Sequence, residues 1–244
     1  MTELPLQDKI VLITGAGRRI GRALALACAA AGANVIVHFL QSGTQAKQLQ
    51  QQITSLGRTA WLVQADLGNE QGVSQLIQKA WEVGSIYALV NNAAVFEPLF
   101  LQTATYAAWN RHLAINLSAP FLLTQAFAAR VPADGEGRIV NILDWRAFRP
   151  GADHFPYSVS KAALAALTRG SAAALAPRVA VNGLALGAIL PPEAEPVEAE
   201  ILDQVPVGRW GALSDVEAAL LFLLSGASYI TGEIIHVDGG RHLT

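Results

Sequence analysis

Residues 9–39 read KIVLITGAGRRIGRALALACAAAGANVIVHF, and this stretch decides the fold. An apolar run from Ile10 to Thr14 is followed by a turn that contains glycine, a segment of helical length from Arg19 to Ala31, and a second apolar run from Asn34 to Phe39. Because both runs are continuous rather than alternating in polarity, they are typical of strands that are buried on both faces. The order strand, helix, strand predicts a parallel pair, since parallel strands need a long crossover between them.

The same alternation continues along the chain. Further continuous apolar runs occupy residues 59–64, 86–91, 138–142 and 179–183, and segments of helical length occupy residues 44–56, 69–83, 106–131 and 157–175. This alternation predicts an α/β fold with a doubly wound parallel sheet that helices cover on both sides. The chain has 244 residues, of which 52% are hydrophobic, so it can fill one large core and we expect a single domain over residues 1–244.

Charge and composition exclude several classes of protein. The formal net charge of -2 provides no positive field for a phosphate backbone, which argues against nucleic acid as a partner. The single cysteine, Cys28, cannot form an internal disulfide, which fits a reducing compartment. The first residues carry Glu3 and Asp8 and lack a signal-peptide pattern, and polar residues or glycine interrupt the apolar stretches. We therefore expect a cytoplasmic protein that does not enter a membrane.

One segment departs from the alternation of strands and helices. Between Ile189 and Val205 the chain holds three prolines and four glutamates. Proline fixes φ and removes backbone donors, so we expect a mobile insert over the sheet rather than a packed strand. Both a lid over a binding site and a solvated acidic loop are consistent with this composition.

A glycine-rich turn follows the first strand directly. It reads TGAGRRIG, from Thr14 to Gly21, and a helical pattern begins within it. In a strand-turn-helix unit, glycine lets backbone N–H groups approach a pyrophosphate, whose charge the helix N-terminus stabilises. A tight turn without a ligand is the alternative, but its place after the first strand of a doubly wound pattern favours a dinucleotide. The expected contacts from this turn are Gly15, Gly17, Arg18, Arg19, Ile20 and Gly21.

The end of the second strand indicates which dinucleotide is bound. An acidic side chain at this point would bind the ribose 2′-hydroxyl of NAD, but the sequence VIVHFLQS, residues 35–42, has no carboxylate. Arg18, His38 and Ser42 offer cationic and hydroxyl donors for a 2′-phosphate instead. We therefore expect NADPH as the cofactor.

The sequence YSVSK contains the strongest catalytic signal. It places Tyr157 and Lys161 four residues apart, on one face of a helix. A tyrosine with a pKa of about 10 is a poor proton donor near neutral pH, and a fixed positive charge nearby moves that pKa toward the operating range. This makes Tyr157 the candidate general acid for the reduction of a C=O or C=N bond, with Asn116 and the sequence NNA at residues 91–93 upstream.

These motifs occur in a characteristic order, from KIVLITG to the terminal VDGG at residues 237–240. The chain thereby resembles the short-chain dehydrogenase/reductase family over nearly its whole length. The resemblance implies a Rossmann-type fold with a seventh strand near residues 234–237, a proton-relay water supported by Asn116, and Asn91 near the cofactor. It also suggests that the tail after Asp238 reaches an active site. The cofactor contacts that it implies are Asp66, Leu67, Asn92, Ala93, Lys161, Gly187 and Ile189.

Some positions depart from the family pattern and bear on the substrate. Asp144 replaces the family's serine thirteen positions before Tyr157, and Arg19 replaces the middle glycine of the turn. A carboxylate beside a tyrosinate raises the proton affinity of both groups, so we expect Asp144 to act as a proton source or relay, with Arg19 balancing its charge.

The same departures, together with Phe96 after NNA, resemble the pteridine reductases of this family, although Gln41 stands where these enzymes usually carry an arginine. The resemblance implies that Phe96 stacks on a pterin ring. The implied substrate contacts are Arg19, Phe96, Asp144 and Tyr157.

The preferred hypothesis is therefore NADPH-dependent reduction of a dihydropterin, such as dihydromonapterin, dihydrobiopterin or dihydrofolate. The alternatives are an NADPH-dependent carbonyl reductase and, as a different class, a non-catalytic NADPH sensor. No metal-binding residues are assigned. The helix that begins at Tyr157 carries Ala or Leu around most of its circumference, which predicts packing against a second copy and, with the family's habit, a homotetramer.

Overall fold

The fold is built on one parallel sheet. The computed structural model describes residues 4–190, 200–226 and 229–244. Within these residues seven strands are hydrogen-bonded in the order β3-β2-β1-β4-β5-β6-β7. Their bounds are β1 Ile10–Ile13, β2 Asn34–Phe39, β3 Ala60–Gln64, β4 Ala88–Asn91, β5 Gly137–Asp144, β6 Val179–Leu186 and β7 Ile234–Val237. The predicted α/β, Rossmann-type doubly wound sheet in a single domain is confirmed.

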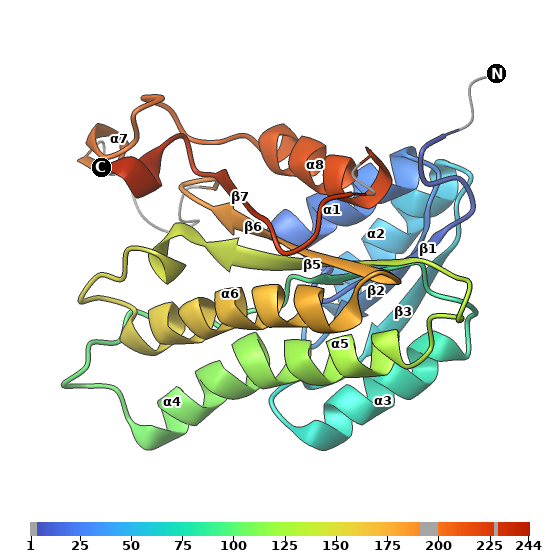
Figure 1. Cartoon of the computed structure of the whole chain (residues 1–244), viewed down its shortest axis with the longest axis horizontal. Helices are drawn as coiled ribbons and strands as arrows, with labels where there is room; N and C mark the ends of the chain where they lie inside the picture. The colour runs from blue at the N-terminus through green and yellow to red at the C-terminus, as the bar shows by residue number, and fades with distance from the viewer. Residues whose placement is uncertain (1–3, 191–199, 227–228) are drawn as a thin grey trace.

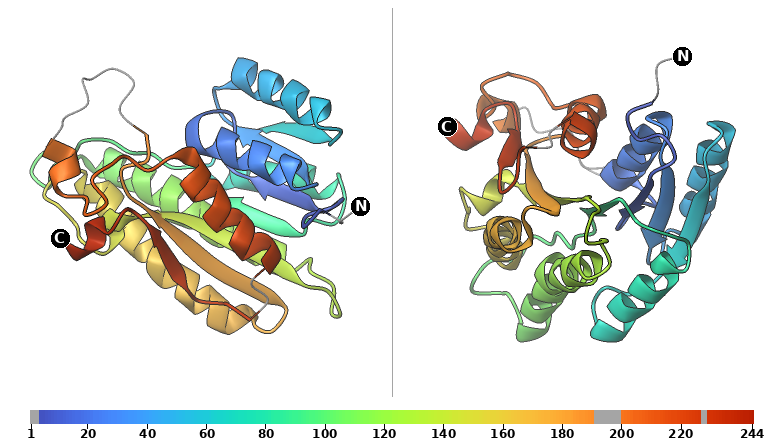
Figure 2. Two further views of the ribbon diagram at one scale, coloured as in Figure 1. Left: turned by 90° about the horizontal axis from the view of Figure 1, so that it is seen from above. Right: turned by 45° about the vertical axis from the view of Figure 1, so that its right-hand side comes forward.

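Helices cover both faces of this sheet (Figure 1). The helices are α1 Arg19–Ala30, α2 Gly43–Ser55, α3 Glu70–Trp81, α4 Tyr106–Leu113, α5 Ala119–Ala128, α6 Phe155–Leu175, α7 Glu200–Asp203 and α8 Leu213–Leu221. One core cluster joins α1, α2 and α8 to the sheet, and a second joins α3 and α5 to its other face, where α6 also packs. Figure 2 shows the sheet between these two layers in its right-hand view. All eight residues of β6 are buried, as a strand covered on both faces requires.

The helical segment predicted over residues 106–131 is divided in the structure. α4 and α5 are joined by a π-helical turn, Ala114–Ser118, and Asn116 lies within that turn. A π turn holds one residue more than an α-helical turn, which changes the direction of the side chains that follow. The apolar periodicity of the sequence does not reveal such a turn.

The strands β5 and β6 extend further than their apolar runs predict. They pair along their whole length, and the last pair is Asp144 with Leu186. Asp144 therefore lies at the carboxyl edge of the sheet, where ligands bind in open α/β sheets. The C-terminus lies at this same edge (Figure 1).

The proline-rich segment is packed at both of its ends. Ile189 and Val205 are buried, and the segment Glu200–Asp203 forms α7. The prediction of a mobile insert over all of residues 189–205 is therefore wrong at the ends, where apolar side chains join the core. The acidic middle, residues 191–199, lies outside the described residues.

The helix α6 is rich in Ala and Leu over 21 residues. Neither it nor any other described helix is long and apolar enough to cross a membrane. Small side chains along it, including Ala162, Ala166 and Ala173, are exposed. This exposure is compatible with the expected packing against a second copy, and the homotetramer stays a prediction.

Candidate active site

The glycine turn is held by hydrogen bonds from distant segments. Thr14 Oγ1 accepts hydrogen bonds from the backbone N–H groups of Asn92 and Ala93, at 2.9 and 3.0 Å. The Asn92 side chain in turn donates to the carbonyl oxygens of Thr14 and Gly15. The predicted contacts Asn92 and Ala93 thus lie against the turn, and they position its backbone.

Two glycines of the turn stand where a side chain would have no room. A Cβ at Gly17 would collide with Ser42 Oγ, and a Cβ at Gly21 would collide with Gly15 O and lie 2.5 Å from Asn92 Nδ2. Gly15 itself has a φ of 63°, in the left-handed region that favours glycine. Arg18 precedes α1 without a side-chain cap to the helix N-terminus. The turn therefore presents a close backbone approach and a helix N-terminus, which fits a pyrophosphate group.

His38 does not face a phosphate, contrary to the prediction. Its side chain is 2% exposed, and its two ring nitrogens contact Gly15 N at 3.0 Å and Ala65 O at 3.1 Å. Burial lowers the pKa of His38 to about 4. A neutral ring with both nitrogens in use cannot supply a cationic donor, so His38 instead holds the glycine turn against β2. Of the three predicted donors, the exposed Arg18 and the half-buried Ser42 remain available at this end.

The other cofactor residues lie along the carboxyl edge of the sheet. Asp66 is exposed and its Oδ1 accepts from Gly68 N at 2.8 Å, while Leu67 is buried beside it. Ile20 is partly buried at the first turn of α1, and Gly187 follows β6. Asn91, in contrast, points into the core, where it donates to Asn141 at 2.8 Å. The expected role of Asn91 beside the cofactor is replaced by a link between β4 and β5.

The proposed proton donor is paired with the unusual aspartate. Tyr157 Oη donates to Asp144 Oδ2 at 3.0 Å, and Asp144 Oδ1 accepts from Arg146 N at 2.9 Å. Burial raises the pKa of Asp144, against the opposing effects of these hydrogen bonds and of the Lys161 and Arg146 charges. The predicted charge balance by Arg19 is thus provided by Lys161 and Arg146, while Arg19 lies exposed in the turn.

The pKa of Tyr157 moves in the direction opposite to the one that a nearby lysine predicts. Burial, followed by the Asp144 charge, raises it well above its ordinary value. Lys161 Nζ donates to Ile142 O at 2.7 Å and lies 5.7 Å from the centre of the Tyr157 ring. Burial lowers the pKa of Lys161 to about 8. In this state the phenol stays protonated, as the Asp144 substitution predicts, and Tyr157 is a donor rather than a phenolate.

Asn116 is fully buried, and its amide organises the loop after β4. Its Oδ1 accepts from Val95 N at 2.8 Å, and its Nδ2 donates to Val95 O and to Ser160 Oγ, both at 3.0 Å. Both amide hydrogens are therefore in use, and the group positions Val95 directly before Phe96. The support of a relay water by Asn116 stays a prediction.

Phe96 is an exposed aromatic rather than a residue of the core. Its side chain is 55% exposed. It stacks on His154 with ring centres 4.0 Å apart and an angle of 11° between the planes, and it meets Tyr157 edge-on at 4.7 Å. A flat ligand that contacts Phe96 would therefore lie next to Tyr157.

Sequence reasoning missed the polar contacts that bring His154 to Phe96. His154 has a left-handed φ of 52°, and its Nδ1 lies 2.8 Å from Asp153 Oδ2. Asp153 also pairs with the Arg146 guanidinium at 2.8 Å. Arg146 therefore connects the loop after Asp144 to the start of α6. The only sequence signal is a charged loop between two elements, which does not specify the partners.

The C-terminal tail also reaches this cleft within one chain. Arg241 lies over the Trp145 ring at 4.2 Å and donates to Gln204 at 3.1 Å. Burial and the nearby Arg146 lower the pKa of Arg241, and the Asp144 carboxylate acts in the opposite direction. The tail therefore adds a cation near Asp144.

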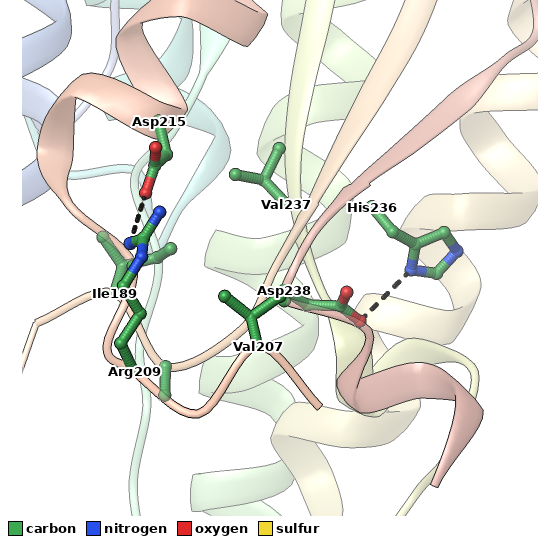
Figure 3. A pocket seen from close by; sticks show the side chains of 10 residues that line it. Ile189, Val207, Arg209, Asp215, His236, Val237 and Asp238 are labelled. Atoms are coloured by element: carbon green, nitrogen blue, oxygen red, sulfur yellow. Dashed lines mark hydrogen bonds and ion pairs between the residues drawn. The ribbon is translucent and has the colours of Figure 1, made fainter. Parts of the chain in front are cut away.

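A pocket of about 150 Å³ opens beside the tail, between β6, β7 and the segment before α8 (Figure 3). Ile189, which the family resemblance assigns to the cofactor, lines it together with Val207, Arg209 and Asp215. Figure 3 shows Arg209 paired with Asp215 on one side and Asp238 directed toward His236 on the other. The Arg209 Nη1 to Asp215 Oδ2 distance is 3.0 Å. This pocket lies beside the predicted cofactor residues and does not include Tyr157 or Asp144.

The chain is similar to several known proteins in sequence and in fold. A family model described as enoyl-(acyl carrier protein) reductase matches residues 15–242. The chain is 37% identical to the 3-oxoacyl-(acyl-carrier-protein) reductase of Aquifex aeolicus, over 98% of this chain and 99% of that protein. It is 32% identical to the 2-dehydro-3-deoxy-D-gluconate 5-dehydrogenase of Bacillus subtilis, over 96% of this chain and 95% of that protein.

A solved structure, FolM alternative dihydrofolate reductase 1 from Brucella canis complexed with NADP, is also similar. Its TM-score is 0.92 and its identity is 34%, and the match covers 100% of this chain and 97% of that chain. The two sequence relatives and the solved structure each cover at least 96% of this chain. The chain therefore belongs to the short-chain dehydrogenase/reductase family.

Proposed function

We propose that the protein uses NADPH to reduce a dihydropterin to the tetrahydro form. The observation that carries this proposal is the 3.0 Å hydrogen bond from Tyr157 to Asp144, a carboxylate in the position of the family's serine. Two further features support it: the exposed Phe96 beside Tyr157, and the similarity to a protein named an alternative dihydrofolate reductase.

The residues of the glycine turn fit the proposed cofactor. The backbone N–H groups of the turn and the N-terminus of α1 would bind the pyrophosphate. Arg18 with Ser42 would take the 2′-phosphate, because no carboxylate follows β2 to repel it. Lys161 would hold the nicotinamide ribose. When bound, NADPH supplies the hydride that reduces the ring C=N bond.

Residues of the chain itself would supply the proton and replace it. Reduction of one C=N bond consumes one hydride and one proton, which ends on the ring nitrogen. Tyr157 Oη holds a proton at neutral pH because burial and Asp144 raise its pKa. After Tyr157 gives up this proton, the replacement reaches the phenolate through Asp144, since the raised pKa of that carboxyl group lets it take up a proton from solvent and pass it across the hydrogen bond. Solvent at the half-buried edge of Asp144 then reprotonates the pair.

Phe96 would orient the flat substrate. Its edge contact with Tyr157 places any ring stacked against it next to the proton donor. His154 already stacks on Phe96. A pterin therefore binds against the remaining face, or it takes the place of the imidazole.

A second candidate is the reduction of a carbonyl group, and the 37% identity to a 3-oxoacyl-(acyl-carrier-protein) reductase favours it. In that reaction Tyr157 would donate directly to the carbonyl oxygen. Asp144 opposes this reaction, because it replaces the serine whose hydroxyl would donate to the carbonyl oxygen, and a carboxylate has no hydrogen to donate there.

A substrate comparison decides between the two candidates. Purified protein is assayed with NADPH against dihydromonapterin, dihydrobiopterin and dihydrofolate, and in parallel against 3-oxoacyl thioesters, sugars and simple ketones. We expect kcat/KM to be highest for a dihydropterin. We also expect Asp144→Ser to lower that value by about 100-fold, in the range of lost acid–base catalysis. NADPH affinity, measured by fluorescence titration, should stay the same.

Asp153→Ser provides the matched control, because Asp153 is a nearby carboxylate that contacts Arg146 and not Tyr157. It should retain most of the pterin activity. Turnover of carbonyls alone would replace the proposal with the second candidate, and tight NADPH binding without turnover in either panel would favour a sensor. Unchanged pterin turnover in Asp144→Ser would remove the role of the carboxylate.

A further inference from the structure

Three potential metal ligands meet where the sheet passes into the C-terminal tail. His236 lies in β7, Asp238 follows that strand, and His242 lies in the short helix Arg241–Leu243. His236 and Asp238 are two residues apart on an extended strand, so their side chains leave it on the same side. Gly239 and Gly240 have φ values of 63° and 86°, and this turn brings His242 back to Asp238.

The ligand atoms are close to one another. Asp238 Oδ2 lies 2.8 Å from His242 Nδ1 and 3.6 Å from His236 Nδ1. All three side chains can offer ligand atoms within 4.8 Å of one another. In a tetrahedral Zn²⁺ site, bonds of about 2.0–2.2 Å place ligand atoms about 3.3 Å apart. Small side-chain rotations therefore suffice to close the site around one ion.

The carboxylate is already oriented by the backbone. The Asp238 side chain is 1% exposed, its Oδ1 accepts from Gly240 N at 3.0 Å, and its Oδ2 accepts from His242 N at 3.0 Å. Such hydrogen bonds are typical of the groups that fix a metal-binding carboxylate. The two imidazole rings stack on each other with their centres 3.9 Å apart, and the nearest carboxylate oxygen to both Nδ1 atoms is Asp238 Oδ2.

One ligand atom lacks a hydrogen-bond partner. His236 Nδ1 is buried, and among the described residues no acceptor or donor lies within hydrogen-bond distance of it, since Asp238 Oδ2 is 3.6 Å away. A buried nitrogen without a partner is costly in free energy, and coordination to a cation would satisfy it. The His236 and His242 side chains are 24% and 29% exposed, which leaves a path for an ion to enter.

We propose that His236, Asp238 and His242 bind one divalent transition-metal ion of the Zn²⁺ class. Two imidazoles and one carboxylate suit such ions, and a fourth position stays open to water. The ion would hold the tail against the loop that follows β5. His236 contacts Phe148 of that loop with ring centres 5.0 Å apart, and Arg241 lies over Trp145. This proposal does not depend on the substrate.

The test measures metal uptake directly. Protein stripped with a chelator is dialysed against Zn²⁺, and the bound metal is counted; Co²⁺ replaces Zn²⁺ in a parallel sample for its absorption spectrum. We expect one saturable ion per chain, and visible Co²⁺ bands of a four- or five-coordinate site. His236→Gln and His242→Gln should each weaken binding by at least tenfold, since loss of a supporting residue alone typically costs 10–100-fold.

The control is His154→Gln, which removes another imidazole that contacts an aspartate, outside the cluster. It should bind metal as the unchanged protein does. No saturable uptake by the unchanged protein, or equal uptake by all the variants, would overturn the proposal. Circular dichroism checks that each variant is folded. If either glutamine variant does not fold, the Co²⁺ spectrum of the unchanged protein decides, because six-coordinate, weakly absorbing Co²⁺ contradicts the site.

Discussion

The two ends of the cleft are built in different ways. At the cofactor end, the glycine turn is held by backbone groups and by buried side chains, such as Thr14 and His38. At the substrate end, Phe96, Asp144 and Arg241 come from three distant segments and are held by rings and charges that are partly exposed. A common cofactor requires a fixed cradle, whereas the residues that select a substrate can differ between relatives on the same scaffold.

The two ends also treat buried ionisable groups differently. His38 is kept neutral by burial, and both of its ring nitrogens are used. Asp144 is half-buried, and it faces Tyr157 and two cations, an arrangement that suits proton exchange. The following substitutions test whether the residues of the cofactor end serve mainly to hold the turn in place, and those of the substrate end mainly to exchange protons.

The largest effect that we expect concerns the acid stability of the cofactor end. The pKa of His38 falls from 6.5 to about 4 on folding, so the unfolded chain binds a proton before the folded chain does. Stability from His38 is complete above pH 6.5 and is lost as the pH falls toward 4. The loss amounts to roughly 3 kcal/mol at 1.36 kcal/mol for each pH unit.

Urea unfolding of the unchanged protein and of His38→Asn at pH 7.5 and pH 4.5 measures this loss. The asparagine can still accept from Gly15 N. Its variant should be less stable at pH 7.5, because the bond to Ala65 is gone, but it should lose less free energy of unfolding on acidification. Equal losses in both proteins would show that His38 does not hold the turn as a neutral ring.

The cofactor end was also the easier one to predict. The strand, the glycine turn and α1 are neighbours in sequence, so their residues specify TGAGRRIG as a turn without knowledge of the rest of the chain. The role of His38 was predicted wrongly, because its burial depends on Ala65 at the end of β3. Sequence alone gives no measure of that burial.

At the substrate end, the sequence predicted which residues would react, but not their surroundings. Asp144 and Tyr157 were identified from their spacing, and the structure brings them together at 3.0 Å. The lysine at position 161 predicts a lowered pKa for Tyr157, and this prediction was wrong. Burial and the Asp144 charge raise that pKa, while the Lys161 ammonium donates to Ile142 O. The stack of His154 on Phe96 joins residues 58 positions apart, and no local pattern encodes that contact.

A pair of glycine substitutions tests the rigidity of the cradle, with an intermediate effect. A Cβ at Gly21 meets the backbone oxygen of Gly15, which cannot move without opening the turn, whereas a Cβ at Gly17 meets mainly Ser42 Oγ, which can rotate. We expect Gly21→Ala to be less stable than Gly17→Ala by about 2 kcal/mol, within the usual cost of overpacking. Thermal unfolding measures the difference.

The Gly17 substitution has a matched rescue. Ser42→Gly removes the obstructing hydroxyl, so the double variant Gly17→Ala with Ser42→Gly should recover most of the melting temperature lost by Gly17→Ala. The same Ser42 change should not rescue Gly21→Ala. Equal melting temperatures for the two alanine variants would mean that the turn adapts as a whole.

The smallest effect on stability is expected at the substrate end, and its dependence on pH is opposite in sign to that of His38. Because burial raises the pKa of Asp144 above 3.8, its contribution to stability is complete below pH 3.8 and is lost as the pH rises through the folded-state pKa. Asp144→Asn removes the buried charge but keeps an acceptor for Arg146 N and a polar partner for Tyr157. At pH 8 this variant should therefore melt a few degrees higher, as about 1 kcal/mol produces in a domain of this size, while pterin turnover falls. At pH 4 the difference should shrink, and a lower melting temperature at pH 8 would mean that the attraction of Lys161 and Arg146 outweighs burial, which would make the carboxylate a structural element like His38.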